Sequence, residues 1–336
     1  MDALLENFWA VLALKLLIVA LLVPVAGLII GYAELKISAH MQARVGPYFA
    51  GGRYGWAQLI ADGVKFFQKE DIIPAEADRP VFKYAPILVL ISAVSLFVVI
   101  PFGPGDALVV RDLDLGIFFA LAISSIGTIG VLMAGWSSAN KYSLIGGLRA
   151  AGQLIAYELP MVLSVIGVVI LAETMSLNGI VEAQIDWGMP FVVPQAVAFV
   201  VFFIAALAEM SRIPFDMPIA ESELTTGYLT EYTGFRFLFF FLGEFANMFT
   251  FAAIAATLFL GGYAPAGAEV FGVAIPDLTG PIWLTLKVGL LVFVMIWTRW
   301  TWPRLREDQL QTFAWKWLVP IGLANIVVTA VMKVLF

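Results

Sequence analysis

The chain has 336 residues, of which 61% are hydrophobic and only 13% are charged. Its mean hydropathy of +0.94 excludes an ordinary soluble domain of this length and is typical of a protein built from membrane-spanning helices. It has no cysteine and a single histidine, His40. This excludes a disulfide framework, thiolate-held zinc or iron–sulfur clusters, and a multi-histidine haem or metal site. We therefore predict that the chain itself holds no metal. The net charge of −6 says little, because the placement of lysine and arginine matters more in membrane proteins.

Eight apolar stretches are long enough to read as transmembrane helices. The first lacks a basic leader and exceeds the roughly 7–15 apolar residues of a signal peptide, so we interpret it as a span. We predict an all-α polytopic membrane protein forming a single integral membrane domain over residues 1–336. The predicted spans lie near Leu12–Tyr32, Tyr84–Phe102, Gly116–Trp136, Gln153–Leu171, Phe191–Met210, Phe237–Leu260, Trp283–Trp300 and Phe313–Val334.

Basic residues gather on one side of the predicted bundle. The segments after the first, third, fifth and seventh spans, counted together with the span ends that carry Arg299 and Lys316, hold fifteen lysines and arginines, whereas those after the other spans carry only Arg111. Because cytoplasmic loops are enriched in lysine and arginine, we predict that the odd-numbered loops face the cytoplasm. Both termini then lie on the opposite side of the membrane.

The longest polar connection is the predicted cytoplasmic loop 34–83. Between Tyr54 and Lys69, apolar and charged residues alternate in a way that predicts an amphipathic helix lying along the membrane interface. Two interpretations remain open for this helix. It is either a plain surface anchor or the wall of a cavity that is entered from the lipid.

A second predicted loop, residues 209–236, concentrates charge between two spans. Charges beside hydrocarbon are costly and usually mark a functional site. Pro214 and Pro218 lack backbone donors and stop the preceding helix, so we predict Glu209 on its last turn and an irregular loop after it. The ionisable residues from Glu209 onward include Arg212, Asp216, Glu221, Glu223 and Glu231.

Other ionisable residues lie inside or at the ends of the predicted spans. Arg149 and Tyr157 share one helix face, with Glu158 beside them. Glu244 lies about two turns into the sixth span, where it is either a proton-relay carboxylate or a neutral partner in a helix–helix hydrogen bond. Lys15, in the first span, either has a similar role or extends its ammonium to the interface.

These residues leave two classes of function open. One is a stand-alone secondary transporter or ion channel. The other is the membrane subunit of a larger redox complex that couples chemistry on soluble partners to proton movement. Many transporters contain internal repeats, and this sequence shows none, which favours the second class.

Several long motifs, in order along the chain, resemble one family. The segments QARVGP, ADGVKFFQKEDIIP, KYSLIGGLRAAGQLIAYE, AEMSRIPFDMP, ESEL, GYLTEYTG and PRLREDQLQTFAWKWLVP are similar to those of the H subunit of proton-pumping NADH–quinone oxidoreductase, respiratory complex I. The resemblance covers about Gly31 to Lys333. Ferredoxin-linked relatives look similar too, as do more distant hydrogenase-linked membrane subunits, so the equivalent subunit of such a complex stays an alternative. It implies a subunit of an NAD-dependent translocase in a bacterial inner membrane, with no catalytic chemistry by this chain alone.

The resemblance also implies a substrate and partners. The subunit would form the membrane side of a chamber for ubiquinone or a related quinone, and would couple electron transport to proton translocation. The quinone would enter between the first span, the sixth span and the amphipathic helix. Partner subunits would carry the flavin and the iron–sulfur clusters. They would include the terminal iron–sulfur subunit, a hydrogenase-like subunit, and small membrane subunits that link to antiporter-like subunits. No nucleic acid is implied.

Two groups of site residues follow from the resemblance. The quinone-chamber residues are Glu34, Lys36, Gln42, Arg44, Asp62, Lys65, Arg212, Asp216, Glu221, Glu223 and Glu231. The proton-coupling residues are Arg149, Tyr157, Glu158, Glu209 and Glu244. Two positions depart from the family pattern: Leu35 stands where the family has arginine, and Ile219 where it has glutamate.

Overall fold

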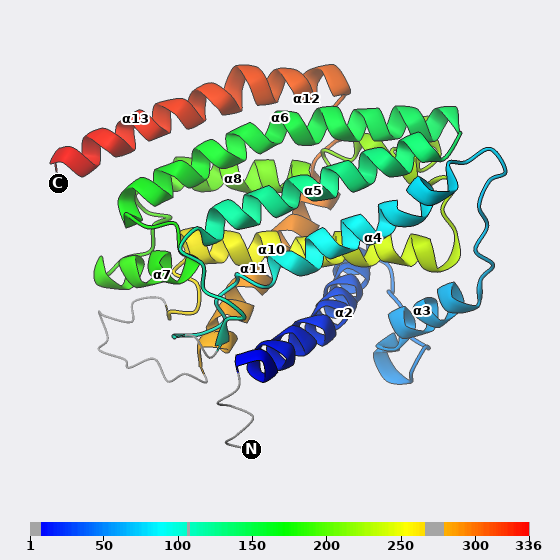
Figure 1. The fold of residues 1–336 in the computed structure, drawn as a ribbon, viewed down its shortest axis with the longest axis horizontal. Coiled ribbons are helices and arrows are strands. Elements are labelled where there is room, and N and C mark those ends of the chain that lie inside the picture. Colours follow the sequence, from blue (N-terminus) through cyan, green and yellow to red (C-terminus); the bar gives the residue numbers. More distant parts are fainter. Residues whose placement is uncertain (1–7, 106–107, 266–278, 336) are drawn as a thin grey trace.

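A computed structural model describes residues 8–105, 108–265 and 279–335, and every regular element in these ranges is helical, which confirms the predicted fold class (Figure 1). The α-helices are α2 Phe8–Met41, α3 Gln58–Gln68, α4 Arg79–Leu96, α5 Gly116–Ser137, α6 Lys141–Ala172, α7 Leu177–Asp186, α8 Ala196–Glu209, α9 Glu221–Leu224, α10 Gly234–Phe259, α11 Gly280–Thr301, α12 Glu307–Phe313 and α13 Val319–Leu335. The 3₁₀ turns are η1 Arg53–Gly55, η3 Met217–Ile219 and η4 Gly227–Leu229, and a π-helical turn, Ala314–Leu318, joins α12 to α13.

Seven helices in the described ranges are long and apolar enough to cross a membrane. The chain is therefore a polytopic membrane protein. The fifth of the eight predicted spans, Phe191–Met210, contains α8, which has only 14 residues. At 1.5 Å per residue α8 is about 21 Å long, shorter than the roughly 30 Å hydrocarbon core. The seven spanning helices are α2, α4, α5, α6, α10, α11 and the continuous stretch Glu307–Leu335.

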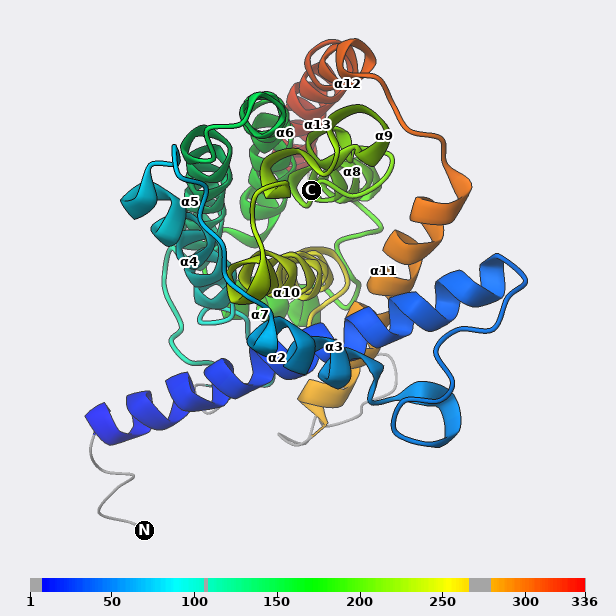
Figure 2. The ribbon, with the colours of Figure 1, turned by 90° about the vertical axis from the view of Figure 1, so that its right-hand side faces the viewer.

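Helix α10 lies inside the bundle. It contacts α2, α4, α8 and α11, and the end-on view of Figure 2 shows it surrounded by the other helices. Helices α4, α5, α6, α10 and α13 run roughly alongside one another, whereas α2 crosses them obliquely (Figures 1 and 2). Helices α2, α8 and α11 finish at one end of the bundle, and α6, α10 and α12 begin there (Figure 1). Most of the ionisable residues named above lie at this end, which we call the charged end.

Several of the predicted boundaries shift, most of all the start of the fourth span, which was predicted at Gln153 and lies at Lys141 in α6. Helix α2 continues past the predicted end at Tyr32 to Met41, so Glu34 and Lys36 lie on the helix rather than in a loop. Within the predicted segment Tyr54–Lys69, the α-helical part is α3, preceded by the turn η1. Helix α8 ends at Glu209, as the prolines that follow it predict.

Close packing of α5 against α6 depends on glycine. A Cβ added at Gly135 would lie 2.8 Å from the Gly147 Cα, so neither position has room for a side chain. Gly146, the preceding residue of α6, meets the turn η4 in the same way. A Cβ there would lie 2.7 Å from the Tyr228 backbone nitrogen. This contact fixes η4, and with it the charged loop, against the start of α6.

Gly146→Ala should therefore destabilise the charged end of the bundle. Overpacking typically costs about 1–3 kcal/mol, and here the clash is with backbone that cannot rotate away. We expect a lower melting temperature for the purified variant in mild detergent. The matched control is Gly289→Ala on α11, where an added Cβ meets nothing within 4 Å. An unchanged melting temperature for Gly146→Ala would contradict this role for the contact.

Candidate functional site

Arg212 is the centre of the charged end. It follows the last turn of α8, and its backbone nitrogen donates to the Leu207 carbonyl at 3.1 Å. Its guanidinium pairs with Glu34 of α2 at 2.6 Å and with Glu244 of α10 at 3.0 Å. Burial would lower the pKa of Arg212, but these two carboxylates outweigh burial and raise it, so the side chain stays charged.

A second, partly exposed arginine joins the buried pair of Arg212 and Glu34. Arg299, on the last turn of α11, pairs with the other oxygen of Glu34. The Arg212 guanidinium also lies 5.0 Å from the centre of the Phe245 ring, within the range of a cation–π contact. The cluster of Glu34, Arg212, Glu244 and Arg299 therefore joins α2, α10, α11 and the loop after α8.

Next to this cluster lies a polar cavity of about 390 Å³. Asp216 lines it and is held by Arg304 through two contacts of 2.6 and 2.7 Å. That hydrogen-bonded pairing raises the pKa of Arg304. The remaining lining residues come from the charged loop, α10 and the end of α11. They are Ile213, Ile219, Glu221, Thr226, Tyr228, Leu229, Phe237, Phe240, Phe241, Glu244 and Arg299.

Ion pairs and hydrogen bonds extend from this cavity toward the surface. Arg149 of α6 pairs with Glu223 of α9 at 2.8 Å and with Glu307 of α12 at 3.1 Å. Glu231 accepts a hydrogen bond of 2.6 Å from Asn140, which also caps the start of α6. These contacts attach the charged loop to the start of α6 and to α12.

Three of the residues predicted to couple protons, Tyr157, Glu158 and Glu209, lie deeper, on α6 and at the end of α8. Glu158 accepts a hydrogen bond from Ser125 of α5. Glu209 ends α8, and its Oε2 atom is buried without a hydrogen-bond partner among the described residues. Tyr157 is fully buried, and its hydroxyl donates to the Leu310 carbonyl of α12 at 3.0 Å. A carboxyl oxygen buried without a partner is costly, which marks Glu209 as a candidate for function.

Some predicted chamber residues lie apart from the charged cluster. Gln42 and Arg44 are exposed in the turn after α2, and Lys36 donates to the Pro47 carbonyl. On α3, Asp62 pairs with Lys65 at 3.0 Å. The structure therefore does not bring these side chains into contact with Arg212.

Asp62 and Lys65 instead line a second, mostly apolar cavity of about 810 Å³. Its walls are α2, α3 and the first half of α10. Phe241 lines both this cavity and the polar one, so the two cavities adjoin at its side chain. The apolar walls are formed chiefly by Pro24, Leu28, Leu59, Phe66, Phe67, Leu238, Phe239, Leu242 and Phe245.

Three residues of the site were not predicted as site residues. Arg299, on the last turn of α11, and Arg304, just after that helix, belong to a basic and aromatic segment that on composition alone fits either an interfacial anchor or a contact with a partner subunit. Tyr228 is buried at the polar cavity, and burial, together with Glu244, raises its pKa, so the phenol stays protonated. Ile219, one of the two positions that depart from the family pattern, also lines this cavity.

The helical bundle and its buried ion pairs define a polytopic membrane protein with an ionisable site at one end. The sequence matches the NADH dehydrogenase family over residues 14–330. It is 50% identical to the H subunit of NADH-quinone oxidoreductase from Bacillus thuringiensis subsp. konkukian (strain 97-27) over 304 residues, or 90% of this chain and 88% of the relative. Proteins of that name from Bacillus cereus (strain AH187) and Bacillus anthracis (strain A0248) are 49% identical over the same length. The chain belongs to this family of NADH-quinone oxidoreductase subunits, which confirms the resemblance.

Arg212→Met should disrupt the charged end more than the loss of one surface arginine would. Removing one partner of a buried pair leaves the other charge uncompensated, typically at about 3–5 kcal/mol. Glu244 would lose its ion pair with Arg212, whereas Glu34 would keep Arg299. We expect less assembled complex and little quinone reductase activity per assembled complex.

The control for this experiment is Arg306→Met, at a side chain that is 78% exposed. It should assemble and turn over as the wild type does. Equal effects of the two substitutions on assembly and activity would contradict the central role of Arg212.

Proposed function

We propose that this chain forms the membrane side of the quinone chamber of an NADH-quinone oxidoreductase and couples quinone reduction to proton translocation. The observation that carries the proposal is the pair of adjoining cavities. A quinone has an apolar tail and a polar headgroup, and ligand sites combine apolar walls with a few placed polar groups. The apolar cavity suits the tail, and the polar cavity beyond Phe241 suits the headgroup.

The apolar cavity would also serve as the entrance. Its walls are α2, α3 and α10, the same three elements that the family resemblance implies as the borders of quinone entry. In this proposal α3 lies along the membrane interface, and Asp62 and Lys65 stand at its polar edge. The headgroup would pass Phe241 and meet Asp216, Glu221 and Arg304.

Coupling would begin with the charge that forms when the quinone is reduced. Charges in a low-dielectric site interact strongly, so reduction would alter the proton affinity of nearby carboxylates. Glu244 lines the polar cavity and pairs with Arg212, so it is the first carboxylate of the buried cluster to respond. Glu209 and Glu158 would then carry the change farther into the membrane, toward antiporter-like subunits.

This function requires partners, because the chain would perform no covalent chemistry. A soluble subunit with the terminal iron–sulfur cluster, and its hydrogenase-like neighbour, would cover the charged end. Other partners would carry the flavin and further clusters, and small membrane subunits would connect to the antiporter-like subunits. In the proposed orientation the charged end faces the cytoplasm of a bacterial cell, and both termini lie on the opposite side of the inner membrane.

Mass spectrometry of proteins that co-purify with the chain in mild detergent tests the assembly. Iron–sulfur subunits and antiporter-like membrane proteins are the expected partners, and the dehydrogenase module would identify the electron donor. A chain that purifies alone, stays folded and transports a solute in liposomes would overturn the proposal in favour of a transporter.

Glu209→Gln should impair coupling while the complex still assembles. The amide has the shape of the carboxyl group but cannot take up and release a proton. Groups that transfer protons typically contribute 10²–10⁴-fold to rates, and we expect proton pumping and quinone reduction to fall by roughly tenfold or more. The readouts are proton uptake by vesicles and NADH oxidation by the same preparation. Full activity with normal pumping would exclude this role.

Gly63→Leu should narrow the apolar cavity without disturbing α3. Gly63 lines that cavity, and a Cβ added there meets nothing within 4 Å. Leucine also favours the helix more than glycine does. We expect the KM for quinone to rise roughly tenfold or more, since one methylene in an apolar pocket is worth about 1–3 kcal/mol and leucine adds four carbon atoms. Gly289→Leu, on an exposed face of α11, is the control and should leave KM unchanged.

A further inference from the structure

The polar cavity contains a hydrogen-bond donor that the chain itself does not use. The lining residues whose side chains can donate are Thr226, Tyr228, Arg299 and Arg304. The Thr226 hydroxyl donates to the Thr225 carbonyl, and the two arginines pair with Glu34 and Asp216. The Tyr228 hydroxyl, in contrast, forms no hydrogen bond with any described residue.

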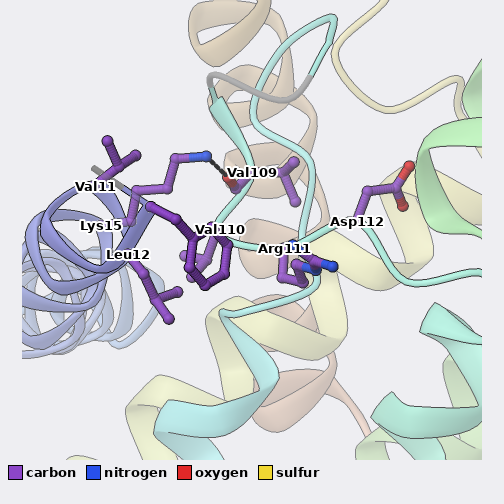
Figure 3. Close-up of a pocket in the computed structure, with 8 residues that line it drawn as sticks. Val11, Leu12, Lys15, Val109, Val110, Arg111 and Asp112 are labelled. Atoms are coloured by element: carbon purple, nitrogen blue, oxygen red, sulfur yellow. Dashed lines mark hydrogen bonds between the residues drawn. The ribbon is translucent and has the colours of Figure 1, made fainter. Parts of the chain in front are cut away.

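Donors of this kind usually find a partner within the protein. In the pocket between the start of α2 and the chain after α4, the Lys15 ammonium donates to the Val109 carbonyl at 2.7 Å (Figure 3). Tyr232, in the same loop as Tyr228, donates to the Phe82 carbonyl at 3.1 Å. Buried tyrosine hydroxyls are normally paired, because an unpaired buried polar group is costly. Tyr228 is only 9% exposed, so its free hydroxyl points to a partner outside the chain.

The carboxylates of the cavity do not supply this partner. Asp216, Glu221 and Glu244 line the same cavity, yet none of them accepts a hydrogen bond from Tyr228. Asp216 and Glu244 are already paired with arginines. Burial and the nearby Glu244 raise the pKa of Tyr228, so the phenol stays protonated and remains a donor.

The turn that carries Tyr228 is fixed in place. Its backbone lies against Gly146 of α6, where an added Cβ would be 2.7 Å from the Tyr228 nitrogen. A Cβ at Gly227, which has a φ of +58°, would collide with the Pro218 carbonyl oxygen. The Tyr228 ring meets the Phe240 ring edge-on, with 5.7 Å between their centres. A donor that is held in advance loses little conformational freedom when a ligand binds.

We propose that the Tyr228 hydroxyl donates a hydrogen bond to a carbonyl oxygen of the quinone headgroup in the polar cavity. The inference rests on the proposed quinone chamber and assigns a binding residue within it. Quinone carbonyl oxygens are acceptors, and the carboxylates of the cavity, which are acceptors too, would repel them. The phenol offers the donor that such an oxygen needs, and no proton or electron leaves Tyr228.

Tyr228→Phe tests this contact, since it removes the hydroxyl and keeps the ring. The whole complex is reconstituted in liposomes, and NADH oxidation is measured with a short-tailed, water-soluble ubiquinone. We expect the KM for quinone to rise about three- to tenfold, as for the loss of one neutral hydrogen bond, with little change in kcat. NADH oxidation by a soluble acceptor that does not need the quinone chamber should be unchanged, which shows that the electron-input module is intact.

The matched control is Tyr232→Phe. Its hydroxyl is bonded within the chain, and its side chain does not line the polar cavity. This variant should have a lower melting temperature and an unchanged KM for quinone.

Infrared difference spectra provide a readout that a purely structural role would not move. The probe is ubiquinone with ¹³C at its carbonyl carbons, because a hydrogen bond lowers the stretching frequency of a carbonyl. We expect a lowered component in the wild type that is missing in Tyr228→Phe. If that variant does not assemble, 3-fluorotyrosine in place of Tyr228 supplies a more acidic donor and should lower the KM.

An unchanged KM or an unchanged carbonyl band in Tyr228→Phe would overturn the contact, and so would an unchanged KM with 3-fluorotyrosine. The hydroxyl would then bind only water. Gly63→Leu separates this failure from failure of the proposed function. If Gly63→Leu raises the KM and Tyr228→Phe does not, the chamber stands without this contact. If neither variant alters the KM, the proposed chamber fails as well.

Discussion

The structure depends on the burial of one permanent charge. Arg212 cannot lose its proton at any physiological pH, and a charge that is taken out of water needs opposite charges close by. Its carboxylates come from α2 and α10, and a second arginine from α11 joins through Glu34. No local sequence pattern could supply these partners, since they are far apart along the chain. The requirement to neutralise Arg212 therefore fixes how the ends of three membrane helices meet.

The same requirement explains why the site is suited to respond to charge. Glu244 faces the polar cavity on one side and Arg212 on the other. A new negative charge in the cavity would attract the same arginines with which the carboxylates pair. Arg212 pairs with both Glu244 and Glu34, so both ion pairs would be affected. Carboxylates that pair with the same arginine are thus coupled through it. A change in the charge of one carboxylate therefore alters the proton affinity of the other. Buried ion pairs contribute little net stability, which fits a cluster retained for function.

Sequence reasoning predicted the helical class, the end of α8 at Glu209 and the ionisable residues of the charged loop. Each of these depends on local chemistry, such as the geometry of proline or the cost of a charge in lipid. It did not predict the extension of α2 to Met41, since an apolar run says where hydrocarbon ends and not where a helix ends. It also left open whether the basic, aromatic segment that contains Arg299 is an interfacial anchor or a contact with a partner subunit. The role of Arg299 depends on Glu34, a long-range pairing that residue type and spacing do not encode.

Helix α2 connects the two ends of the molecule. It has 34 residues, which corresponds to about 51 Å and exceeds the hydrocarbon core by enough to require the oblique course seen in Figure 2. Its second half carries Glu34 and walls the apolar cavity, and its first turns carry Lys15. Pro24 lies between these two parts of α2, removes one helical hydrogen bond and lines the apolar cavity, so the two halves of the helix need not share one direction.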